Sequence, residues 1–556
     1  MPSVRGADVL AAALASAGVG HIFSLSGNHI MPVYDAALDA RLNIVHVRHE
    51  GAAVHMADAW ARVTGEVGIA LLTGGPGHAN GVGALYTALA SESPLVMLSG
   101  HAPLGEIGYG SFQELRQADM AAPAVKASWT AGSAAALGQD LARAIRTAKS
   151  GRPGPVHLSL PMDVLEAKVD AAGAIPAPDA FSVAPLMLGE HTADAVNALL
   201  RDAQRPLVLT GPVMANGRGR MLQEKLAAAI GAPVLCMESP RGVNDPCLGA
   251  FAEVLAQADL IVLLGKQPDF TLRFCRPPVV DAGCRFVVID PEPDALRRAL
   301  KVLEPAQRVV LAAIGEPRAA AQRLIERAPQ RRSGAQAWAD EVQSAVRFRP
   351  AEWENLKSPA AGSLHPVEVG RAVQKILDRS PDAVLVADGG EFGQWSQACV
   401  SAPTRIINGP GGSIGSAIPF ALAAKMARPD APVIAMLGDG TFGFHLAEFD
   451  TAVRSHLPIV AVVGNDACWN AEYQIQLRTY GKARTTGCEL LPTRYDQAVA
   501  GLGGHGEMVT QAADLPAALE RALASGKPSC VNAMIARLPA PVVARAAVSR
   551  PAGGAH

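Results

Sequence analysis

The sequence predicts an α/β protein made of three doubly wound parallel-sheet domains. Short apolar runs of the kind that form buried parallel strands alternate along the chain with stretches whose apolar residues recur at helical spacing. The 556 residues are enough for three or four domains of ordinary size, and a hydrophobic content of 49% supplies an ample core. Segments rich in Pro, Gly and polar residues divide the chain into three blocks.

The first block covers residues 1–175. It opens with a helical stretch at 6–17 and continues with apolar strands at 44–47, 68–72 and 95–98. A linker rich in Ala, Pro and Asp, residues 169–185, closes it.

The central block covers residues 186–335. Its strands begin at 206–209 and continue through 260–264 to 286–290, with helical stretches between them, which favours a parallel sheet. Gly211, Gly217 and Gly219 are spaced too loosely for a dinucleotide fingerprint. A polar connector at 330–363 leads to the next block.

The third block covers residues 364–540. A buried strand at 432–437 is followed by apolar residues at helical spacing, from Phe442 to Val453, and by another strand at 458–463. This order is a βαβ unit. The tail, residues 541–556, is rich in Ala, Pro and Val, and both a lid segment and a disordered end fit it.

Composition excludes several classes of protein. The net charge of -2 gives no reason to expect a nucleic-acid surface. No apolar stretch approaches the roughly 18 residues that span a bilayer, and the N-terminus lacks the pattern of a signal peptide, so a cytoplasmic location is expected. The eight cysteines form no Cys-x-x-Cys pair, which argues against structural zinc and a disulfide framework.

Two short motifs in the third block predict a metal and diphosphate site. Gly438-Asp439-Gly440 follows one strand and Asn465-Asp466 follows the next. Because parallel strands end at the same edge of a sheet, Asp439 and Asp466 are expected to meet there, and their oxygens suit a hard cation. The glycines allow a phosphate to approach the backbone, and the helix N-terminus adds free N–H groups.

The chain resembles thiamine-diphosphate-dependent enzymes of the acetolactate synthase, benzaldehyde lyase and 2-hydroxyacyl-CoA lyase group. Besides the Gly-Asp-Gly motif, the segments that carry this resemblance fall in family order along most of the chain: Arg48-His49-Glu50, Gly75-Pro76-Gly77 with Asn80, Phe112-Gln113-Glu114, Gly154-Pro155-Val156 with Pro161 and Asp163, and Gly411-Gly412-Ser413-Ile414-Gly415.

The resemblance implies a pyrimidine-binding domain at 1–175, a central Rossmann-like domain at 186–335 and a diphosphate-binding domain at 364–540. In this family the cofactor lies between the first domain of one subunit and the third domain of its partner. A homodimer at minimum, often assembled into a homotetramer, is therefore implied.

The resemblance also assigns cofactor contacts. Glu50 would hydrogen-bond the aminopyrimidine ring, the carbonyl of Gly412 would meet its amine, and Ile414 would hold the cofactor bent. Magnesium would be bound by Asp439, Asp466 and the main-chain carbonyl of Cys468. Asp466 departs from the family, which generally has a second Asn there, and adds negative charge beside the diphosphate. The cofactor-binding residues expected in full are Glu50, Gly75, Asn80, Gly390, Glu391, Phe392, Gly412, Ile414, Gly438, Gly440, Thr441 and Asp466.

For the substrate, His29 matches a proton-transfer group and Gln113 a residue that orients the substrate oxygen, although a lone His is more often structural. No paired histidines of the pyruvate decarboxylase kind follow residue 110, which disfavours simple decarboxylation. The expected substrate pocket comprises Asn28, His29, Gln113, Met162, Gly393, Gln474 and Ile475.

The expected function is a carbon-carbon carboligase or lyase acting on 2-keto acids or acyloins. Residues 267–274 with Arg276-Pro277-Pro278 look like the corresponding stretch of 2-hydroxyacyl-CoA lyases and oxalyl-CoA decarboxylases, which keeps that alternative open. The central domain would bind FAD, an ADP moiety of coenzyme A, or nothing. Asp466 also makes a non-catalytic, cofactor-binding homologue conceivable.

Overall fold

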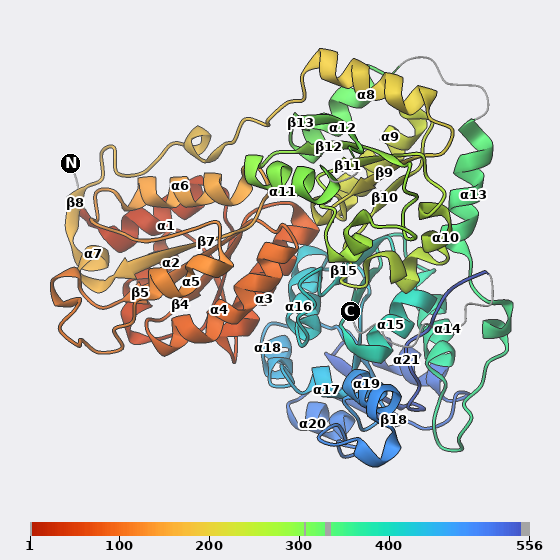
Figure 1. Ribbon diagram of the computed structural model, residues 1–556. Helices are drawn as coiled ribbons and strands as arrows, with labels where there is room; N and C mark the ends of the chain where they lie inside the picture. The colour runs from red at the N-terminus through yellow and green to blue at the C-terminus, as the bar shows by residue number, and fades with distance from the viewer. Residues whose placement is uncertain (1–2, 305–306, 329–334, 546–556) are drawn as a thin grey trace.

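The computed structural model describes residues 3–304, 307–328 and 335–545. Three parallel sheets, each covered by helices, follow one another along the chain and lie around a common junction (Figure 1). The predicted fold class is confirmed.

The first sheet has the strand order β3-β2-β4-β5-β7-β6, and all neighbours are parallel. Its two faces are covered by separate groups of helices, as a doubly wound fold requires. The strands are β2 (His21–Ser24), β3 (Asn43–His46), β4 (Gly68–Leu72), β5 (Leu95–His101), β6 (Ala127–Thr130) and β7 (Pro155–Pro161). One face carries α1 (Gly6–Ser16), α2 (Met31–Asp39) and α6 (Leu137–Lys149), and the other carries α3 (Glu50–Thr64) and α4 (Pro76–Ala90).

The predicted linker at 169–185 is partly ordered into a strand. Its beginning belongs to β8 (Lys168–Asp170), which pairs antiparallel with β1 (Ser3–Arg5). The two short helices α5 (Gln117–Ala121) and α7 (Met162–Glu166) complete this part of the chain.

The central sheet has the order β10-β9-β11-β12-β13, again all parallel. Its strands are β9 (Pro206–Thr210), β10 (Val234–Cys236), β11 (Leu260–Leu264), β12 (Arg285–Asp290) and β13 (Val309–Ile314). Helices α8 (Glu190–Asp202), α9 (Gly217–Ile230) and α12 (Pro317–Glu326) cover one face. Helices α10 (Phe251–Leu255), α11 (Pro293–Leu303) and α13 (Ala335–Arg347) cover the other.

Part of the segment that was expected to be a polar connector forms a helix. Residues 335–347 form α13, and Trp338, Val342 and Ala345 pack into the hydrophobic core beneath the central sheet. The apolar positions of this helix lie four and three residues apart, so one face is buried although the segment is polar overall.

The third sheet has the order β15-β14-β16-β17-β19-β18 and is also parallel. Its strands are β14 (Val384–Ala387), β15 (Thr404–Ile407), β16 (Val433–Gly438), β17 (Val460–Asn465), β18 (His505–Val509) and β19 (Ser529–Met534). Its helices are α14 (Pro366–Leu377), α15 (Gly390–Cys399), α16 (Ala417–Ala427), α17 (Asp439–Phe442), α18 (Glu448–Arg454), α19 (Asn470–Tyr480), α20 (Tyr495–Gly501) and α21 (Leu515–Ala524).

The apolar residues at helical spacing from Phe442 to Val453 do not form one continuous helix. The structure has two short helices there, α17 and α18. Between them the chain is drawn toward the loop that precedes α16: the ring of Phe444 lies against Gly415, and Nδ1 of His445 is 2.6 Å from the Gly415 carbonyl oxygen. These contacts keep residues 443–447 out of a continuous helix.

Helices α3 and α16 join the first and third sheets, and they lie side by side at the centre of Figure 1. Their apolar residues belong to one hydrophobic core. Arg62 on α3 stacks over the ring of Phe420 and donates a hydrogen bond to the Ile407 carbonyl at the end of β15. The two sheets are therefore held as one unit within a single chain.

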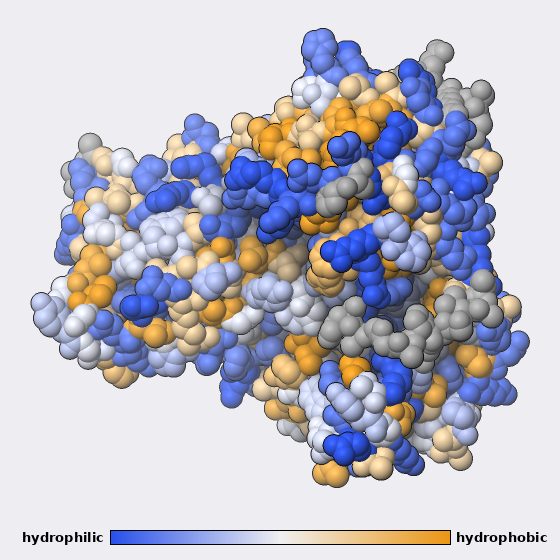
Figure 2. Space-filling model, viewed as in Figure 1, coloured by the Kyte–Doolittle hydropathy of each residue, from blue (hydrophilic) through white to orange (hydrophobic). Residues whose placement is uncertain are grey.

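The outer surface is mostly polar on the face in view, with hydrophobic residues gathered over the central part of the chain (Figure 2). Within residues 3–304, 307–328 and 335–545, no helix combines the length and hydrophobicity needed to cross a membrane.

Candidate active site

The two predicted metal-binding carboxylates lie where β16 and β17 end. Asp439 is the first residue of α17 and is almost fully buried, and its Oδ2 has no hydrogen-bond partner among the residues that the structure describes. Burial raises the pKa of Asp439 to about 6, although backbone N–H groups, those of Gly440 and Cys468 among them, oppose the rise. Burial and then the charge of Asp439 raise the pKa of Asp466 to about 8. The charge of Asp439 thus disfavours the charge of Asp466, and a divalent cation bound by both side chains would relieve this repulsion.

The loop after β17 supplies a third oxygen. Among the described residues, the main-chain carbonyl of Cys468 accepts no hydrogen bond. Burial raises the pKa of the Cys468 thiol to about 12, so this thiol stays protonated and is a poor metal ligand. An unpartnered carboxylate oxygen, a second carboxylate and a free carbonyl together fit a hard divalent cation such as Mg²⁺.

Arg537 holds this loop and was not singled out from the sequence. Its Nη2 donates to the carbonyl oxygens of Asp466 and Ala467 at 3.2 and 3.1 Å. Its charge also lowers the pKa of Asp466, against the stronger effects of burial and Asp439. The extra negative charge that Asp466 brings is therefore partly offset within the chain.

Close backbone approaches surround the two carboxylates. A Cβ at Gly440 would lie 2.6 Å from the Trp469 ring, and one at Gly464 would lie 2.4 Å from the ring of Phe392. A Cβ at Gly389 would lie 2.8 Å from Cγ2 of Ile414. Three of the predicted cofactor segments, at 390–392, 412–414 and 438–441, are thus brought to one edge of the third sheet. Gly390 and Gly412 have φ angles of 78° and 69°, a conformation that favours glycine.

Asp388 ties two of these segments together, a role the sequence did not reveal. Its buried carboxylate accepts hydrogen bonds from the backbone N–H groups of Gly389, Gly415 and Ala417. The loop that carries Gly412 and Ile414 is therefore fixed against the loop that carries Gly390 and Glu391.

The predicted residues of the first block gather at the corresponding edge of the first sheet. Asn80 Nδ2 donates to Glu50 Oε2 at 3.0 Å, and Glu50 is itself largely buried at the first turn of α3. Thr73 lies at the centre of the group: its side chain is 3.4 Å from His29 Nδ1 and within 2.6 Å of the Cβ position of Gly77. Thr73 was missed because no motif marks it.

His29 and Gln113 lie beside this group. The His29 ring stacks on Phe112 with centroids 5.9 Å apart, and burial lowers the pKa of His29, so the ring is neutral at neutral pH. Gln113 has a left-handed φ of 57°, and its carbonyl oxygen lies 2.5 Å from the Cβ position of Gly75. Gln117 Oε1 accepts from the Gly75 N–H at 2.8 Å and fixes that turn.

The other expected pocket residues are divided between the two edges. Asn28 is exposed next to His29, and Met162 follows β7 at the same edge of the first sheet. Gly393 and the partly exposed Glu391 are on α15, while Gln474, bonded to Asn470, and Ile475 are on α19.

Within one chain, the two groups remain separate. Among the described residues, no hydrogen bond, ion pair or ring contact joins Glu50 or His29 to Asp439 or Asp466. Instead, Glu448 on α18 accepts hydrogen bonds from the N–H groups of Arg48 and His49 and so anchors the turn before Glu50 on the third domain.

Comparison with known proteins identifies two families of domain, one in each part of the chain that carries a group of predicted site residues. Residues 4–120 match the N-terminal and residues 388–533 the C-terminal thiamine pyrophosphate-binding domain of thiamine pyrophosphate enzymes. The acetolactate synthase large subunit IlvG of Mycobacterium tuberculosis is 33% identical over 545 residues, which cover 96% of each chain. The human 2-hydroxyacyl-CoA lyase 2 is 31% identical, with 96% of this chain and 91% of the human protein covered.

Proposed function

The chain belongs to the thiamine pyrophosphate enzyme family, and we propose that it is a magnesium-dependent carboligase or lyase that makes or breaks carbon-carbon bonds of 2-keto acids or acyloins. The observation that carries the proposal is the buried, unpartnered Oδ2 of Asp439 opposite Asp466 at the edge of the third sheet. A cation bound there would stabilise the ionised form of both carboxyl groups, whose pKa values burial raises.

Asp439, Asp466 and the Cys468 carbonyl would hold Mg²⁺, and the metal would hold the diphosphate of the cofactor. The N–H groups at the start of α15 and α17 face the same edge and suit phosphate oxygens. When bound, thiamine diphosphate supplies a nucleophilic carbon that adds to a carbonyl group and an electron sink for the bond that breaks.

Glu50 would accept or donate the proton of the pyrimidine ring nitrogen, with its carboxylate oriented by Asn80 at 3.0 Å. Because Glu50 and Asp439 do not meet within one chain, we propose that two chains form a homodimer in which each site takes Glu50 from one subunit and the metal from the other. Further assembly into a homotetramer is compatible with this arrangement.

His29 would transfer a proton to or from the substrate oxygen, because it is neutral, buried and placed on the same edge as Glu50. Gln113 would orient that oxygen from its strained left-handed position.

A second candidate, a 2-hydroxyacyl-CoA lyase, is favoured by the loop at 270–278. Arg273 and Arg276 are exposed there, and among the described residues neither forms an ion pair with a carboxylate. Both guanidinium groups are free to meet phosphates of a coenzyme A moiety. The human relative carries that activity in its name.

The experiment measures turnover of pyruvate, benzoin and a 2-hydroxyacyl-CoA with thiamine diphosphate and Mg²⁺ present or omitted. We expect cofactor-dependent turnover of one of them, and a loss of at least about 100-fold in the Glu50→Gln variant. The matched control is Glu66→Gln, because Glu66 is exposed and lies just beyond the C-terminal end of α3.

Mixing inactive Glu50→Gln and Asp439→Asn subunits tests the shared site. A mixed dimer contains one intact site, so activity should reappear after the subunits exchange. Turnover that survives in Glu50→Gln would contradict the mechanism, while cofactor binding without any turnover would favour a non-catalytic homologue.

A further inference from the structure

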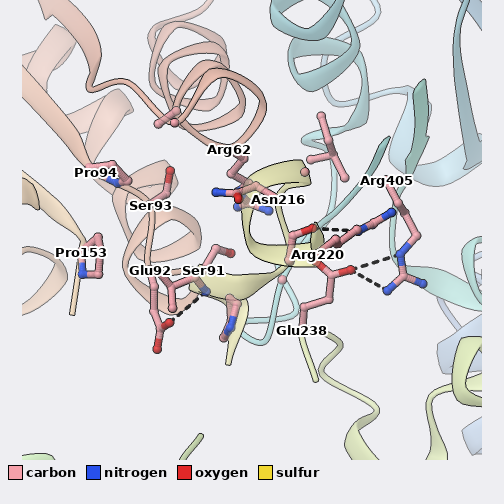
Figure 3. A pocket seen from close by; sticks show the side chains of 18 of the residues that line it. Arg62, Ser91, Glu92, Ser93, Pro94, Pro153, Asn216, Arg220, Glu238 and Arg405 are labelled. Atoms are coloured by element: carbon pink, nitrogen blue, oxygen red, sulfur yellow. Dashed lines mark hydrogen bonds and ion pairs between the residues drawn. The ribbon is translucent and has the colours of Figure 1, made fainter. Parts of the chain in front are cut away.

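A polar cavity lies where the three domains meet (Figure 3). Its volume is about 120 Å³, which is room for one small anion with a few waters. The first domain lines it with Arg62, Ser91 and Lys149, and the central domain with Asn216, Arg220 and Arg318. Glu238, which follows β10, also lines it, and Arg405 on β15 faces it from the third domain. None of these residues belongs to the edge that carries Asp439 and Asp466.

The charges of this cavity do not balance. Five cationic side chains line it against the carboxylates of Glu92 and Glu238, in a chain whose net charge is -2. Arg62 is neutralised by two hydrogen bonds to Asp58, and Arg405 by its ion pair with Glu238. Glu92 is already paired with Arg152, which approaches it from outside the cavity wall.

Three cations remain without a carboxylate partner among the described residues: Lys149, Arg220 and Arg318. Within the part of the chain that the structure describes, Arg220 donates to the backbone carbonyls of Ala215, Ala402 and Pro403. Arg318 donates to the Val213 carbonyl; burial and then the neighbouring Arg218 lower its pKa, while Glu92 and Glu316 act in the opposite direction. An anion in the cavity would relieve the crowding of these positive charges.

Buried donors in the wall also lack partners. Ser91 Oγ, Arg318 Nε and Arg405 Nη1 are buried and form no hydrogen bond with any residue in the described ranges. Ser91 is 5% exposed and the Arg405 side chain 10% exposed, so water from bulk does not satisfy them freely. In addition, α9 begins at Gly217 beside Asn216, and its first turn presents the positive end of a 14-residue helix.

We propose that this cavity binds a phosphate group that bridges the three domains. Phosphate carries close to two negative charges and several acceptor oxygens, which matches three unpaired cations and the unpartnered donors better than a single carboxylate would. The group belongs either to inorganic phosphate or to a phosphorylated metabolite such as a nucleotide.

Isothermal titration of the enzyme saturated with thiamine diphosphate and Mg²⁺ tests the site, because the cofactor then blocks its own diphosphate position. We expect saturable binding of inorganic phosphate or ADP. Arg220→Gln and Arg318→Gln should each weaken binding about tenfold or more, the usual effect of losing a charge-assisted hydrogen bond. Arg379→Gln, at an exposed ion pair with Glu520, should leave it unchanged.

The affinities for inorganic phosphate and for ADP distinguish free phosphate from a nucleotide as the source of the phosphate group. If inorganic phosphate binds as tightly as ADP, free phosphate is the ligand; if ADP binds at least tenfold more tightly with the same sensitivity to Arg220→Gln, a nucleotide is. Lys149→Gln, a half-buried side chain without hydrogen bonds among the described residues, serves if the arginine variants do not fold. Binding of neither ligand, or binding that all three substitutions leave unchanged, would overturn the proposal.

Discussion

At the scale of single residues, Asp466 is the expected metal ligand that adds a second negative charge to the site. Its carboxylate joins a site that already contains Asp439, and Arg537 offsets part of this charge through contacts with the main chain of the loop. The remaining negative charge of the site favours binding of a cation with strong affinity for anionic oxygens. It disfavours binding of the diphosphate without that cation.

Replacing Asp466 by Asn tests this balance. The amide keeps an oxygen ligand but removes one charge, so we expect the Mg²⁺ concentration for half-maximal activity to rise about tenfold while turnover at saturating metal is retained. Titration of activity with Mg²⁺ measures it. Asp466→Ala, which removes the ligand, should lose metal-dependent activity; an Asp466→Ala variant with unchanged metal dependence would remove Asp466 from the site.

The residues predicted from sequence were those that sit in short motifs. Asp439 stands in a local pattern whose chemistry can be argued from its neighbours in the sequence, while Glu50 and Gly412 were assigned through motifs of the family that the chain resembles. Asp388, Thr73 and Glu448 act through contacts that arise only on folding: Asp388 reaches a loop 27 residues away, and Glu448 reaches backbone N–H groups 400 residues away. No local pattern encodes such pairings.

At the scale of elements, strands were predicted better than irregular segments. The strands at 68–72 and 260–264 coincide with β4 and β11, because fully buried parallel strands are continuous apolar runs. The helix in the predicted connector was hidden by its polar surface, and the break between α17 and α18 depends on contacts of Phe444 and His445 with Gly415, which spacing along the chain does not contain.

The carboxyl edge of the central sheet is the place where FAD would bind in this domain. Arg152 pairs with Asp290 after β12 and with Glu92 from the first domain, and it donates to the Gly265 carbonyl after β11. Glu92 in turn accepts from the Val213 N–H after β9. The groups that would meet a diphosphate at a switch point are thus occupied by this chain's own side chains.

We therefore expect the purified protein to carry no flavin, and added FAD to leave turnover unchanged. Visible absorbance of the protein and of the supernatant after denaturation measures bound flavin, with thiamine diphosphate quantified in the same sample as the control for cofactor retention. Release of one flavin per chain would show that the ion pairs around Arg152 open to admit it.

At the scale of the whole molecule, the contact between the first and third domains contains a group of packed histidines. His55 on α3 packs edge-on against Phe420 and His445, and His445 also faces His49. Burial, then the neighbouring His445, Arg62 and His49, lower the pKa of His55 well below its ordinary value, and burial lowers that of His445 to about 4. We therefore expect this contact between the two domains to be sensitive to acid.

The sign of this sensitivity follows from the lowered pKa values. The unfolded chain takes up protons on these histidines near pH 6.5, whereas the folded chain does not, so stability is lost as the pH falls below about 6.5. His55→Phe keeps an aromatic ring against Phe420 but cannot be protonated. We expect its melting temperature to fall less between pH 7 and pH 5 than that of the unmodified protein, measured in the same buffers. His191→Phe, at an exposed histidine on α8, should behave like the unmodified protein, and an equal fall in all three would assign the acid sensitivity to other groups.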